Sequence, residues 1–301
     1  GKDIIASAQT GTGKTAAFLL PVINKIMSLS QDESIKALII VPTRELAVQI
    51  DQQLEGLSYY TSISSLAVYG GGDGSEFATE KKALSTGADI IIGTPGRLIA
   101  HLNMGYVRLD KLNFLILDEA DRMLDMGFNE DIMTIVGKLP KERQSLMFSA
   151  TMPQKIRELA RKLLTEPEEI NIAISKPAER IVQAAFSVYE NQKVPLTQHI
   201  LKAKPLQSVI IFCSTKSSTK TLNRALKKHG VLSEEIHSDL DQKERENVLR
   251  KFKNKELNVL VATDILSRGI DVEDIELVIN YDVPNDGEEY NHRIGRTDRA
   301  A

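Results

Sequence analysis

Several features are scarce or absent in this sequence of 301 residues, and each absence excludes a class of protein. No apolar run approaches the roughly 18 to 20 residues of a membrane-spanning helix, so the sequence does not predict a membrane protein. The single cysteine, Cys213, excludes a disulfide framework and favours a reducing, cytoplasmic compartment, with the nucleus left open. Tryptophan is absent and aromatic residues make up 5% of the chain, so we expect little of the base stacking that many single-strand binders use.

The charges nearly balance, with 38 Lys and Arg against 41 Asp and Glu and a formal net charge of −3. A nucleic-acid partner would therefore need a local basic groove, and the overall charge neither supports nor excludes such a partner. A prior of roughly 150 residues per domain predicts two domains. Because the chain opens at Gly1, within a segment patterned like folded structure, we expect it to be a fragment and assign no targeting signal.

Short apolar runs alternate with amphipathic, helix-length segments in two successive blocks, which predicts an α/β fold of two mainly parallel sheets flanked by helices. The strands predicted for the first block are 4–6, 37–41, 66–69, 90–92, 114–117, 145–148 and 169–172. Those predicted for the second are 184–189, 209–212, 233–236, 259–261 and 277–279. A stretch with proline, small residues and charge divides the chain into domain 1 (1–173), a linker (174–180) and domain 2 (181–301).

A cluster of Gly, Thr, Arg or Asp follows nearly every predicted strand. Because parallel strands end at one side of a sheet, these clusters predict an active-site rim. The clearest cluster is AQTGTGKT at Ala8–Thr15, a phosphate-binding loop with alanine in place of the first glycine. Its glycines let backbone N–H groups turn toward phosphate oxygens, Lys14 would reach the β and γ phosphates, and Thr15 would place its hydroxyl on Mg²⁺. The alternative interpretation is a glycine-rich turn before a helix.

The apolar strand Phe114–Leu117 ends in Asp118, Glu119 and Asp121. On its own such a pattern is better explained by an acidic helix start, because carboxylates favour the helix N-terminus. Beside a phosphate loop, however, Asp118 would hold the Mg²⁺ of a nucleotide, and Glu119 would position or deprotonate the attacking water. The two motifs together predict a nucleoside triphosphatase.

Cations come late in the chain, where Arg293, Arg296 and Arg299 repeat every third residue beside His292. An arginine from another domain that reaches the γ phosphate accelerates phosphoryl transfer by about 10³ to 10⁵. A solvated basic helix face is the alternative for these residues.

A second set of clusters suits a nucleic-acid backbone, because Thr, Gly and Arg after a strand contact phosphate and sugar more readily than they read bases. The clusters are Pro42–Glu45, Thr94–Arg97 and Thr263–Arg268. For each cluster taken singly, an ordinary turn or helix cap is the alternative.

Taken together, the motifs resemble those of the DEAD-box family of ATP-dependent RNA helicases over essentially the whole chain. The matching motifs are AQTGTGKT, PTRELA, the pair Gly70 and Gly71, TPGR, DEAD, SAT at Ser149–Thr151, QxxR at Gln242–Arg245, TDxxxRGID at Thr263–Asp271 and HRIGRT at His292–Thr297. The resemblance implies two RecA-like domains with ATP and Mg²⁺ between them and RNA lying across both, gripped without regard to sequence. It implies RNA-stimulated ATP hydrolysis that unwinds short duplexes or remodels RNA–protein complexes through domain closure. We expect a monomer.

The resemblance also implies roles for individual residues. Lys14 is a catalytic residue beside Glu119, with Arg296 and Arg299 as arginine fingers. ATP contacts come from the loop residues Ala8, Gln9, Thr10, Gly11, Thr12, Gly13, Lys14 and Thr15, and from Asp271 at the ribose. Mg²⁺ is held by Thr15 and, through water, by Asp118. Coupling between nucleotide and RNA falls to Asp121, Ser149, Thr151 and His292. RNA contacts fall to Arg44, Thr94, Gly96, Arg97, Arg245, Thr263 and Gly269.

Three departures from the family pattern stand out. The adenine-reading Q motif would lie upstream of Gly1, and the family continues into a further strand and helix after Ala301, so we expect an unpaired strand edge in the second sheet. Asp298 stands where the family has glycine, and we expect its carboxylate, between the two predicted fingers, to weaken hydrolysis.

Two other functions stay open at this stage, an ATP-dependent RNA clamp with little turnover and a DNA-directed helicase or translocase. His101, His199 and His229 lack metal-ligand spacing and are interpreted as surface or cap residues.

Overall fold

The computed structural model of the chain describes residues 1–8, 13–29, 32, 34–70, 74–171, 181–203, 206–263, 275–284, 287–295 and 297. The chain divides into two compact units, Gly1–Ile174 and Ser175–Ala301, and each is described by itself. The linker predicted at 174–180 lies outside the described residues, so its bounds stay a prediction. No described helix has the length and apolar character that crossing a bilayer requires.

The first unit is built on a sheet of seven strands in the order β3-β4-β2-β5-β6-β1-β7, and every neighbouring pair is parallel. Its strands are β1 (Ile4–Ser7), β2 (Ala37–Ile40), β3 (Ser65–Val68), β4 (Ile90–Gly93), β5 (Phe114–Leu117), β6 (Gln144–Ser149) and β7 (Glu168–Asn171). All seven strands predicted for the first block are confirmed, within a residue at each end.

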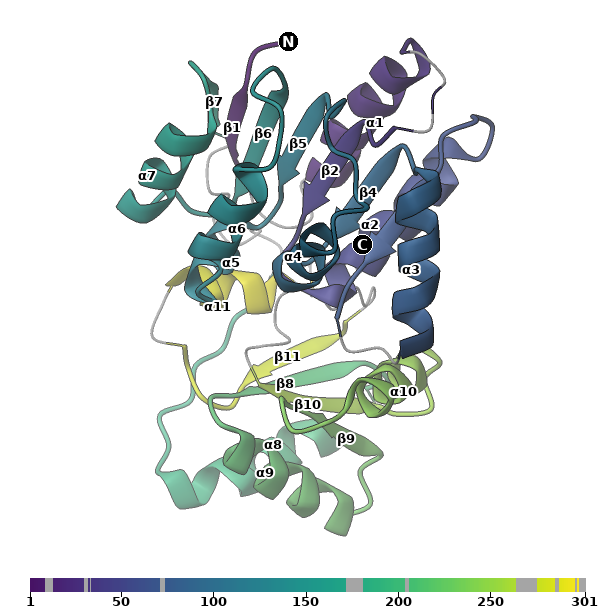
Figure 1. The fold of residues 1–301 in the computed structure, drawn as a ribbon. Helices are drawn as coiled ribbons and strands as arrows, with labels where there is room; N and C mark the ends of the chain where they lie inside the picture. The colour runs from purple at the N-terminus through teal and green to yellow at the C-terminus, as the bar shows by residue number, and fades with distance from the viewer. Residues whose placement is uncertain are drawn as a thin grey trace. The chain divides into compact units, whose positions relative to one another are not determined.

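Helices cover both faces of this sheet (Figure 1). One face carries α1 (Lys14–Met27) and α2 (Arg44–Ser58). The other carries α3 (Gly74–Thr86), α4 (Pro95–Asn103), α5 (Ala120–Asp125), α6 (Asn129–Val136) and α7 (Gln154–Leu163). Strand β2 shows why the sequence is apolar throughout. Ala37 and Ile39 pack toward α1 and α2, whereas Leu38 and Ile40 pack on the opposite face, so both sides of the strand are core.

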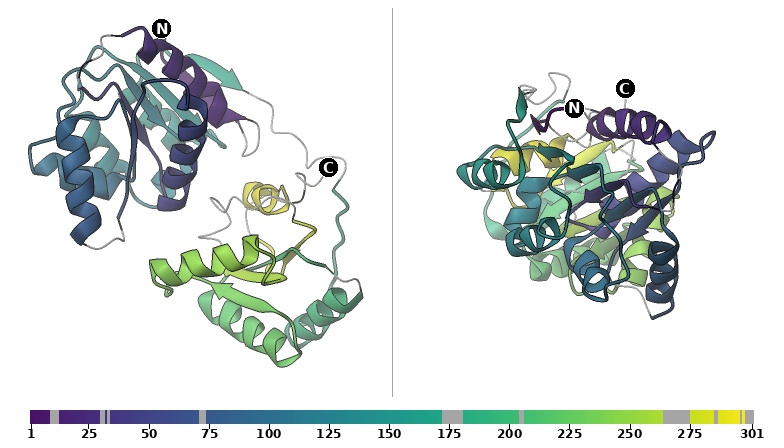
Figure 2. Two further views of the ribbon diagram at one scale, coloured as in Figure 1. Left: turned by 90° about the vertical axis from the view of Figure 1, so that its right-hand side faces the viewer. Right: turned by 45° about the horizontal axis from the view of Figure 1, so that its top comes forward.

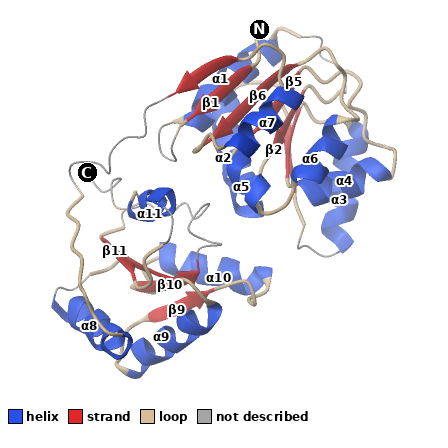
Figure 3. Cartoon of the chain, turned by 90° about the vertical axis from the view of Figure 1, so that its left-hand side faces the viewer, coloured by secondary structure: helices blue, strands red, loops and turns tan. Residues whose placement is uncertain are grey.

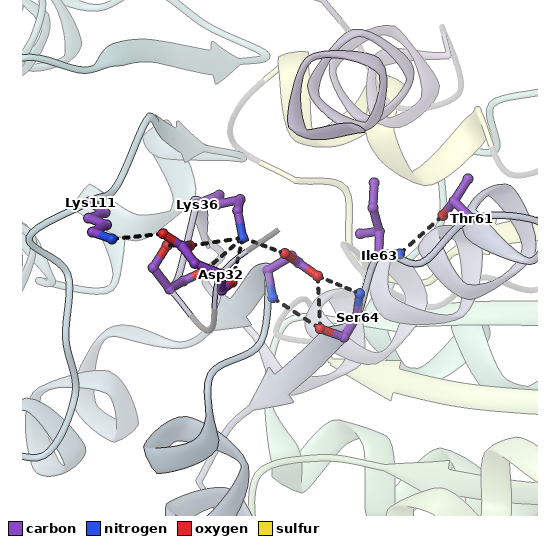
Figure 4. Close-up of polar contacts among 8 residues, drawn as sticks. Asp32, Lys36, Thr61, Ile63, Ser64 and Lys111 are labelled. Atoms are coloured by element: carbon purple, nitrogen blue, oxygen red, sulfur yellow. Dashed lines mark hydrogen bonds and ion pairs between the residues drawn. The ribbon is translucent and has the colours of Figure 1, made fainter. Parts of the chain in front are cut away.

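The amino ends of these strands carry paired charges. Lys36, directly before β2, donates from Nζ to Asp89 Oδ1 at 2.8 Å, and its side chain is 4% exposed. The other oxygen of Asp89 accepts from the Ser64 backbone N–H at 2.9 Å. Asp32 bridges Lys36 and Lys111, as Figure 4 shows. Each carboxylate has a cation or an N–H donor as partner, so the charges at this end of the sheet are compensated within the protein.

The second unit has a sheet of four parallel strands in the order β11-β8-β10-β9. Its strands are β8 (Val209–Cys213), β9 (Ser233–Ile236), β10 (Val259–Thr263) and β11 (Leu277–Asn280). Its helices are α8 (Glu190–Ala203), α9 (Lys216–Lys228), α10 (Gln242–Lys253) and α11 (Gly287–Ile294). Helices α8 and α9 pack on one face and α10 on the other (Figures 2 and 3). Two parallel sheets flanked by helices confirm the predicted α/β fold class.

The strand predicted at 184–189 is wrong. Residues 181–189 are described, and they form no strand. Val182 is 96% exposed and Phe186 59% exposed. A short apolar run shows that a segment is suited to a sheet, but a strand exists only where a neighbour completes its backbone hydrogen bonds, and no described strand pairs with this one.

Candidate functional site

In the first unit, the predicted site residues that the structure describes gather at the carboxyl end of the sheet. The parallel register aligns Ser7 of β1 with Ser149 of β6, and Ile40 of β2 with Leu117 of β5. The residues after those strand ends therefore share one side of the unit. They include Ala8, Gly13, Lys14, Thr15, Arg44, Thr94, Gly96, Arg97, Asp118, Glu119, Asp121, Ser149 and Thr151. This gathering is what the polar clusters after each strand predict.

The phosphate loop is described at its two ends. Ala8 is buried, and its N–H donates to the Ser149 carbonyl oxygen at 3.1 Å, which ties the loop to the end of β6. Gly13 precedes α1 with φ 82° and ψ 15°, a left-handed conformation that favours glycine. Lys14 and Thr15 are the first two residues of α1, whose first turn holds no acidic residue. The positive end of the helix dipole is thus left for an anion. Gln9, Thr10, Gly11 and Thr12 lie outside the described residues.

Asp118 is a buried carboxylate directly after β5, with 3% of its surface exposed. Burial raises its pKa to about 6, the Lys14 ammonium opposes that rise, and the charges of Glu119 and Asp121 add to it. One oxygen accepts from the Glu119 backbone N–H at 2.9 Å. A carboxylate whose charge is this poorly compensated suits a bound cation, which would restore the ionised form.

The donor set fits Mg²⁺ bound together with a nucleotide. The described residues hold no group of three or more His, Cys, Asp or Glu that could bind a metal unaided. Mg²⁺ is usually held by one or two carboxylates together with substrate phosphates and water, so a site with Asp118 and the hydroxyl of Thr15 would have the kind of protein donors that such an ion takes.

Glu119 has an unusual backbone conformation. Its φ of 52° and ψ of 49° lie in the left-handed region, which a residue with a Cβ rarely adopts, and it precedes α5. Its carboxylate accepts from Arg122 Nη1 at 3.3 Å, and its side chain is 13% exposed. Strained backbone persists where the surrounding structure fixes it, and it is concentrated at catalytic positions.

Two predicted coupling residues carry buried polar atoms that have no hydrogen-bond partner among the described residues. These atoms are Asp121 Oδ2 and Ser149 Oγ, and Ser149 is fully buried. Thr151 follows β6 in an irregular segment and is half-buried. An unsatisfied buried oxygen costs about 1 to 3 kcal/mol, so its presence signals a ligand or an alternative contact.

The predicted RNA contacts of the first unit lie at the starts of α2 and α4. Arg44 is the first residue of α2, and its guanidinium lies over the Tyr69 ring at 4.4 Å. Thr94 precedes α4, and Gly96 is exposed in its first turn, where an added Cβ would meet no atom within 4 Å. Arg97 packs over the Phe77 ring at 4.5 Å.

In the second unit, Arg245 lies in the first turn of α10 and Thr263 ends β10. Thr263 is 5% exposed, and its Oγ1 has no hydrogen-bond partner among the described residues. Because β9 and β10 are parallel, both residues belong to the carboxyl end of the second sheet.

Of the three arginines at the end of the chain, the structure describes Arg293, which is fully buried. It donates to Asn280 Oδ1 at 3.0 Å and to the Asp282 carbonyl oxygen at 2.8 Å, and it packs over the Phe212 ring. Arg293 therefore holds α11 to the second sheet. Gly269, Asp271, Arg296, Asp298, Arg299 and the side chain of His292 lie outside the described residues, so their roles stay predictions.

The sequence interpretation missed a buried network beside Arg97. His101 is not a surface or cap residue, because 1% of it is exposed. Its Nε2 lies 2.8 Å from Glu80 Oε2, and its Nδ1 contacts the Tyr106 hydroxyl. Helical spacing offers a signal for this network, since Arg97 and His101 lie four apart on α4, but the partner helix is not readable from one chain segment.

Comparison with known proteins gives two family matches. Residues 1–159 match the model described as DEAD/DEAH box helicase, and residues 192–301 match the helicase conserved C-terminal domain. The ATP-dependent RNA helicase CshA of Listeria monocytogenes is 46% identical over 301 residues, which are 100% of this chain and 57% of that protein. The DEAD-box ATP-dependent RNA helicase CshA of Geobacillus kaustophilus is 42% identical over 99% of this chain and 63% of that protein. The chain thus spans about three fifths of the length of these relatives.

Comparison with solved structures gives matches to the same family. Dbp5 of S. cerevisiae, in a structure bound to RNA and ADP BeF3, matches with a TM-score of 0.82 and 31% identity over 99% of this chain and 76% of that one. A DEAD box protein of Methanococcus jannaschii matches with a TM-score of 0.55 and 41% identity over 100% of this chain and 80% of that one. These matches confirm the predicted pair of RecA-like domains. With more than half of its residues matching the family model, the chain belongs to the DEAD/DEAH box helicase family.

Proposed function

We propose that this chain carries the ATP-hydrolysing and RNA-binding units of an ATP-dependent RNA helicase, in which RNA-stimulated hydrolysis separates short duplexes or remodels RNA–protein complexes. The observation that carries the proposal is the pairing of two features at one end of the first sheet. Helix α1 begins there with Lys14 and Thr15 directly after Gly13, and Asp118 is buried nearby with its pKa raised to about 6. The start of α1 is suited to binding phosphates, and the buried carboxylate of Asp118 is suited to the cation that accompanies them.

The roles follow from what each side chain offers. Lys14 and the loop Ala8–Thr15 bind the phosphates, and Thr15 and Asp118 would hold Mg²⁺, which neutralises phosphate charge when bound. Glu119, fixed by its backbone and by Arg122, orients the attacking water and accepts its proton. Arg296 and Arg299 supply positive charge to the γ phosphate, and Asp271 contacts the ribose.

The remaining predicted residues concern RNA. Backbone contacts are assigned to Arg44, Thr94, Gly96, Arg97, Arg245, Thr263 and Gly269. Asp121, Ser149, Thr151 and His292 are assigned to coupling. The unsatisfied oxygens of Asp121 and Ser149 support that assignment, because a buried oxygen without a partner in this structure is available for a hydrogen bond that forms in a second conformation or with a ligand. The named activity of the CshA relatives supports RNA as the partner. The single cysteine supports a cytoplasmic location.

The test is ATP turnover by the 301-residue chain alone, with single-stranded RNA and with DNA of the same length. We expect stimulation by RNA and a loss of about 10² to 10⁴ in rate for Glu119→Gln, with nucleotide binding retained. RNA retention in the presence of ATP without turnover would instead identify an RNA clamp, in keeping with Asp298 between the predicted fingers. Stimulation by DNA in preference to RNA would identify a DNA translocase. Turnover that Glu119→Gln leaves unchanged would contradict the proposed site.

A further inference from the structure

Glu80, on α3, is a buried carboxylate that pairs with Arg97, one of the arginines assigned to RNA. The residue is 6% exposed, and both of its oxygens are engaged. Oε2 accepts from Arg97 Nε at 2.7 Å and lies 2.8 Å from His101 Nε2. Oε1 accepts from the Tyr69 backbone N–H at 3.4 Å, and the Tyr69 ring lies under the Arg44 guanidinium. One carboxylate therefore contacts Arg97 directly and Arg44 through a single intervening residue.

The geometry of two helices creates this arrangement. Phe77 and Glu80 lie three apart on α3, and Arg97 and His101 lie four apart on α4, so each pair shares one helix face. The Phe77 ring stacks on the His101 ring with centroids 4.3 Å apart and planes 13° apart, and it also lies 4.5 Å from the Arg97 guanidinium. These contacts fix the ring of His101 and the plane of Arg97 together.

His101 in turn holds Glu80. A carboxylate accepts hydrogen bonds, so the hydrogen of His101 Nε2 points at Glu80, and the Tyr106 hydroxyl contacts Nδ1 on the other side of the ring. With both nitrogens engaged and one face stacked, the imidazole has a single orientation. Glu80 is thereby held where its Oε2 meets Arg97.

Arg97 retains donors after this pairing. Its Nε is bound to Glu80, and its Nη2 is buried with no hydrogen-bond partner among the described residues. A guanidinium is a planar fork, so fixing Nε and one face fixes the direction of the other N–H groups. The side chain is 15% exposed, so part of it reaches the surface at the carboxyl end of the sheet although Nη2 itself is buried.

We propose that Glu80, oriented by His101, is a positioning residue for RNA binding, which holds Arg97, and through Tyr69 also Arg44, in the conformation that contacts the RNA backbone. This inference rests on the proposed function and adds to it a residue that does not itself touch RNA. The direction in which RNA affinity changes when the carboxylate is removed distinguishes this role from an effect of charge. Removing a carboxylate from the neighbourhood of phosphates should strengthen RNA binding if charge alone matters. Removing a positioning carboxylate should weaken it, because Arg97 then gains rotamer freedom that binding must take away.

The experiment measures the affinity of the 301-residue chain for a fluorescent single-stranded oligouridylate, with Mg²⁺ and a non-hydrolysable ATP analogue, over a range of salt concentrations. Arg97→Ala should weaken binding about tenfold and lower the salt slope by about 0.7, the value for one phosphate contact on a single strand. Glu80→Gln should weaken binding with the same loss of slope. In the Arg97→Ala background, Glu80→Gln should weaken binding no further.

Two variants separate positioning from folding and from charge. Glu80→Asp keeps the charge but is one methylene too short to meet Arg97, so we expect weaker RNA binding from it as well. Asp89→Asn is the matched control, because it neutralises a half-buried carboxylate paired with a buried cation at the opposite end of the same sheet. It should leave RNA affinity unchanged whatever it does to stability, and thermal unfolding of every variant is recorded alongside.

Unchanged or tighter RNA binding by Glu80→Gln, or equal weakening in the presence and absence of Arg97, would overturn the positioning role while leaving the proposed function intact. If the parent chain binds no RNA under these conditions, the proposed function fails, and the positioning role fails with it. A loss confined to Glu80→Gln, with Glu80→Asp behaving as the parent, would also overturn it, because charge and not reach would then be what matters.

Discussion

The two ends of the seven-stranded sheet both bury charged side chains, but they treat them in opposite ways. At the amino end, Asp89 accepts from Lys36 and from the N–H and hydroxyl of Ser64. Although burial alone would raise the pKa of Asp89, these hydrogen bonds together lower it. Asp3 likewise accepts from the backbone N–H groups of Ser145 and Thr165, each at 2.7 Å. Every such carboxylate is matched within the fold.

At the carboxyl end, burial raises the pKa of Asp118 to about 6, and Asp121 Oδ2 and Ser149 Oγ find no partner among the described residues. Glu119 adds a left-handed backbone. Buried charge by itself therefore does not mark a functional site. What marks it is charge and polarity left uncompensated by the protein, at a cost in stability that a ligand can offset.

The largest effect expected on stability is at the amino end. Asp89→Asn removes the nearer of the two carboxylates that pair with Lys36, whose side chain is 4% exposed, and leaves only Asp32 at 3.6 Å. Breaking a buried ion pair from one side costs about 3 kcal/mol or more. We expect the first unit to unfold about 6 to 12 °C lower in a thermal scan, with the steady-state KM for ATP unchanged. A shift below about 2 °C would show that the Lys36–Asp89 pair contributes little to the stability of the first unit.

Asp118→Asn should act in the opposite direction. The carboxyl group titrates near pH 3.9 in an unfolded chain and at about 6 in the fold, so folding disfavours its charged form. The resulting cost is absent below pH 4, grows between pH 4 and 6, and is complete above that range, where it amounts to about 2 to 3 kcal/mol. Without nucleotide or Mg²⁺, the variant should therefore melt about 5 to 10 °C higher than the parent at pH 8 and equal to it at pH 4, while losing ATP hydrolysis.

That prediction is checked by thermal scans at several pH values in the presence of a chelator. A gain in stability that does not change between pH 4 and pH 8 would show that packing, and not the charge of Asp118, is responsible. Lower stability of the variant at pH 8 would contradict the contrast between the two ends.

The strands and the placement of the polar residues that follow them could be predicted from the sequence. Apolar runs such as Phe114–Leu117 have the right length and composition for buried parallel strands, and the polar residues after them must share one end of a parallel sheet. The placement of Lys14, Asp118 and Ser149 follows from that topology without further information. The strand predicted at 184–189 failed because its pattern says nothing about whether a neighbouring strand is present.

The contacts between side chains that lie far apart in the sequence could not be predicted. His101 looks like an isolated histidine in the sequence, because Glu80 and Phe77 reach it from another helix. Arg293 belongs to a regular repeat of arginines, yet its contacts with Asn280 and Asp282 bury it. Which polar side chains stay unsatisfied depends on these long-range contacts, so the distinction between the two ends of the sheet needs the structure.

The smallest effect on stability is expected at Gly96, so a substitution there can test RNA binding separately from folding. Gly96 is exposed in the first turn of α4, its φ is not positive, and an added Cβ would meet nothing within 4 Å. Gly96→Ala should leave stability equal or higher by less than about 1 kcal/mol, because alanine loses less conformational entropy on folding. If RNA backbone passes close to this position, the added methyl should weaken RNA binding about fivefold.

Gly93 is the matched control for that substitution, because a Cβ there would meet the Leu98 side chain at 2.7 Å. Gly93→Ala should therefore lower the melting temperature, the reverse of what we expect at Gly96. Urea unfolding and RNA anisotropy measured on both variants separate the two effects. If Gly96→Ala binds RNA as tightly as the parent chain, Gly96 is not an RNA contact.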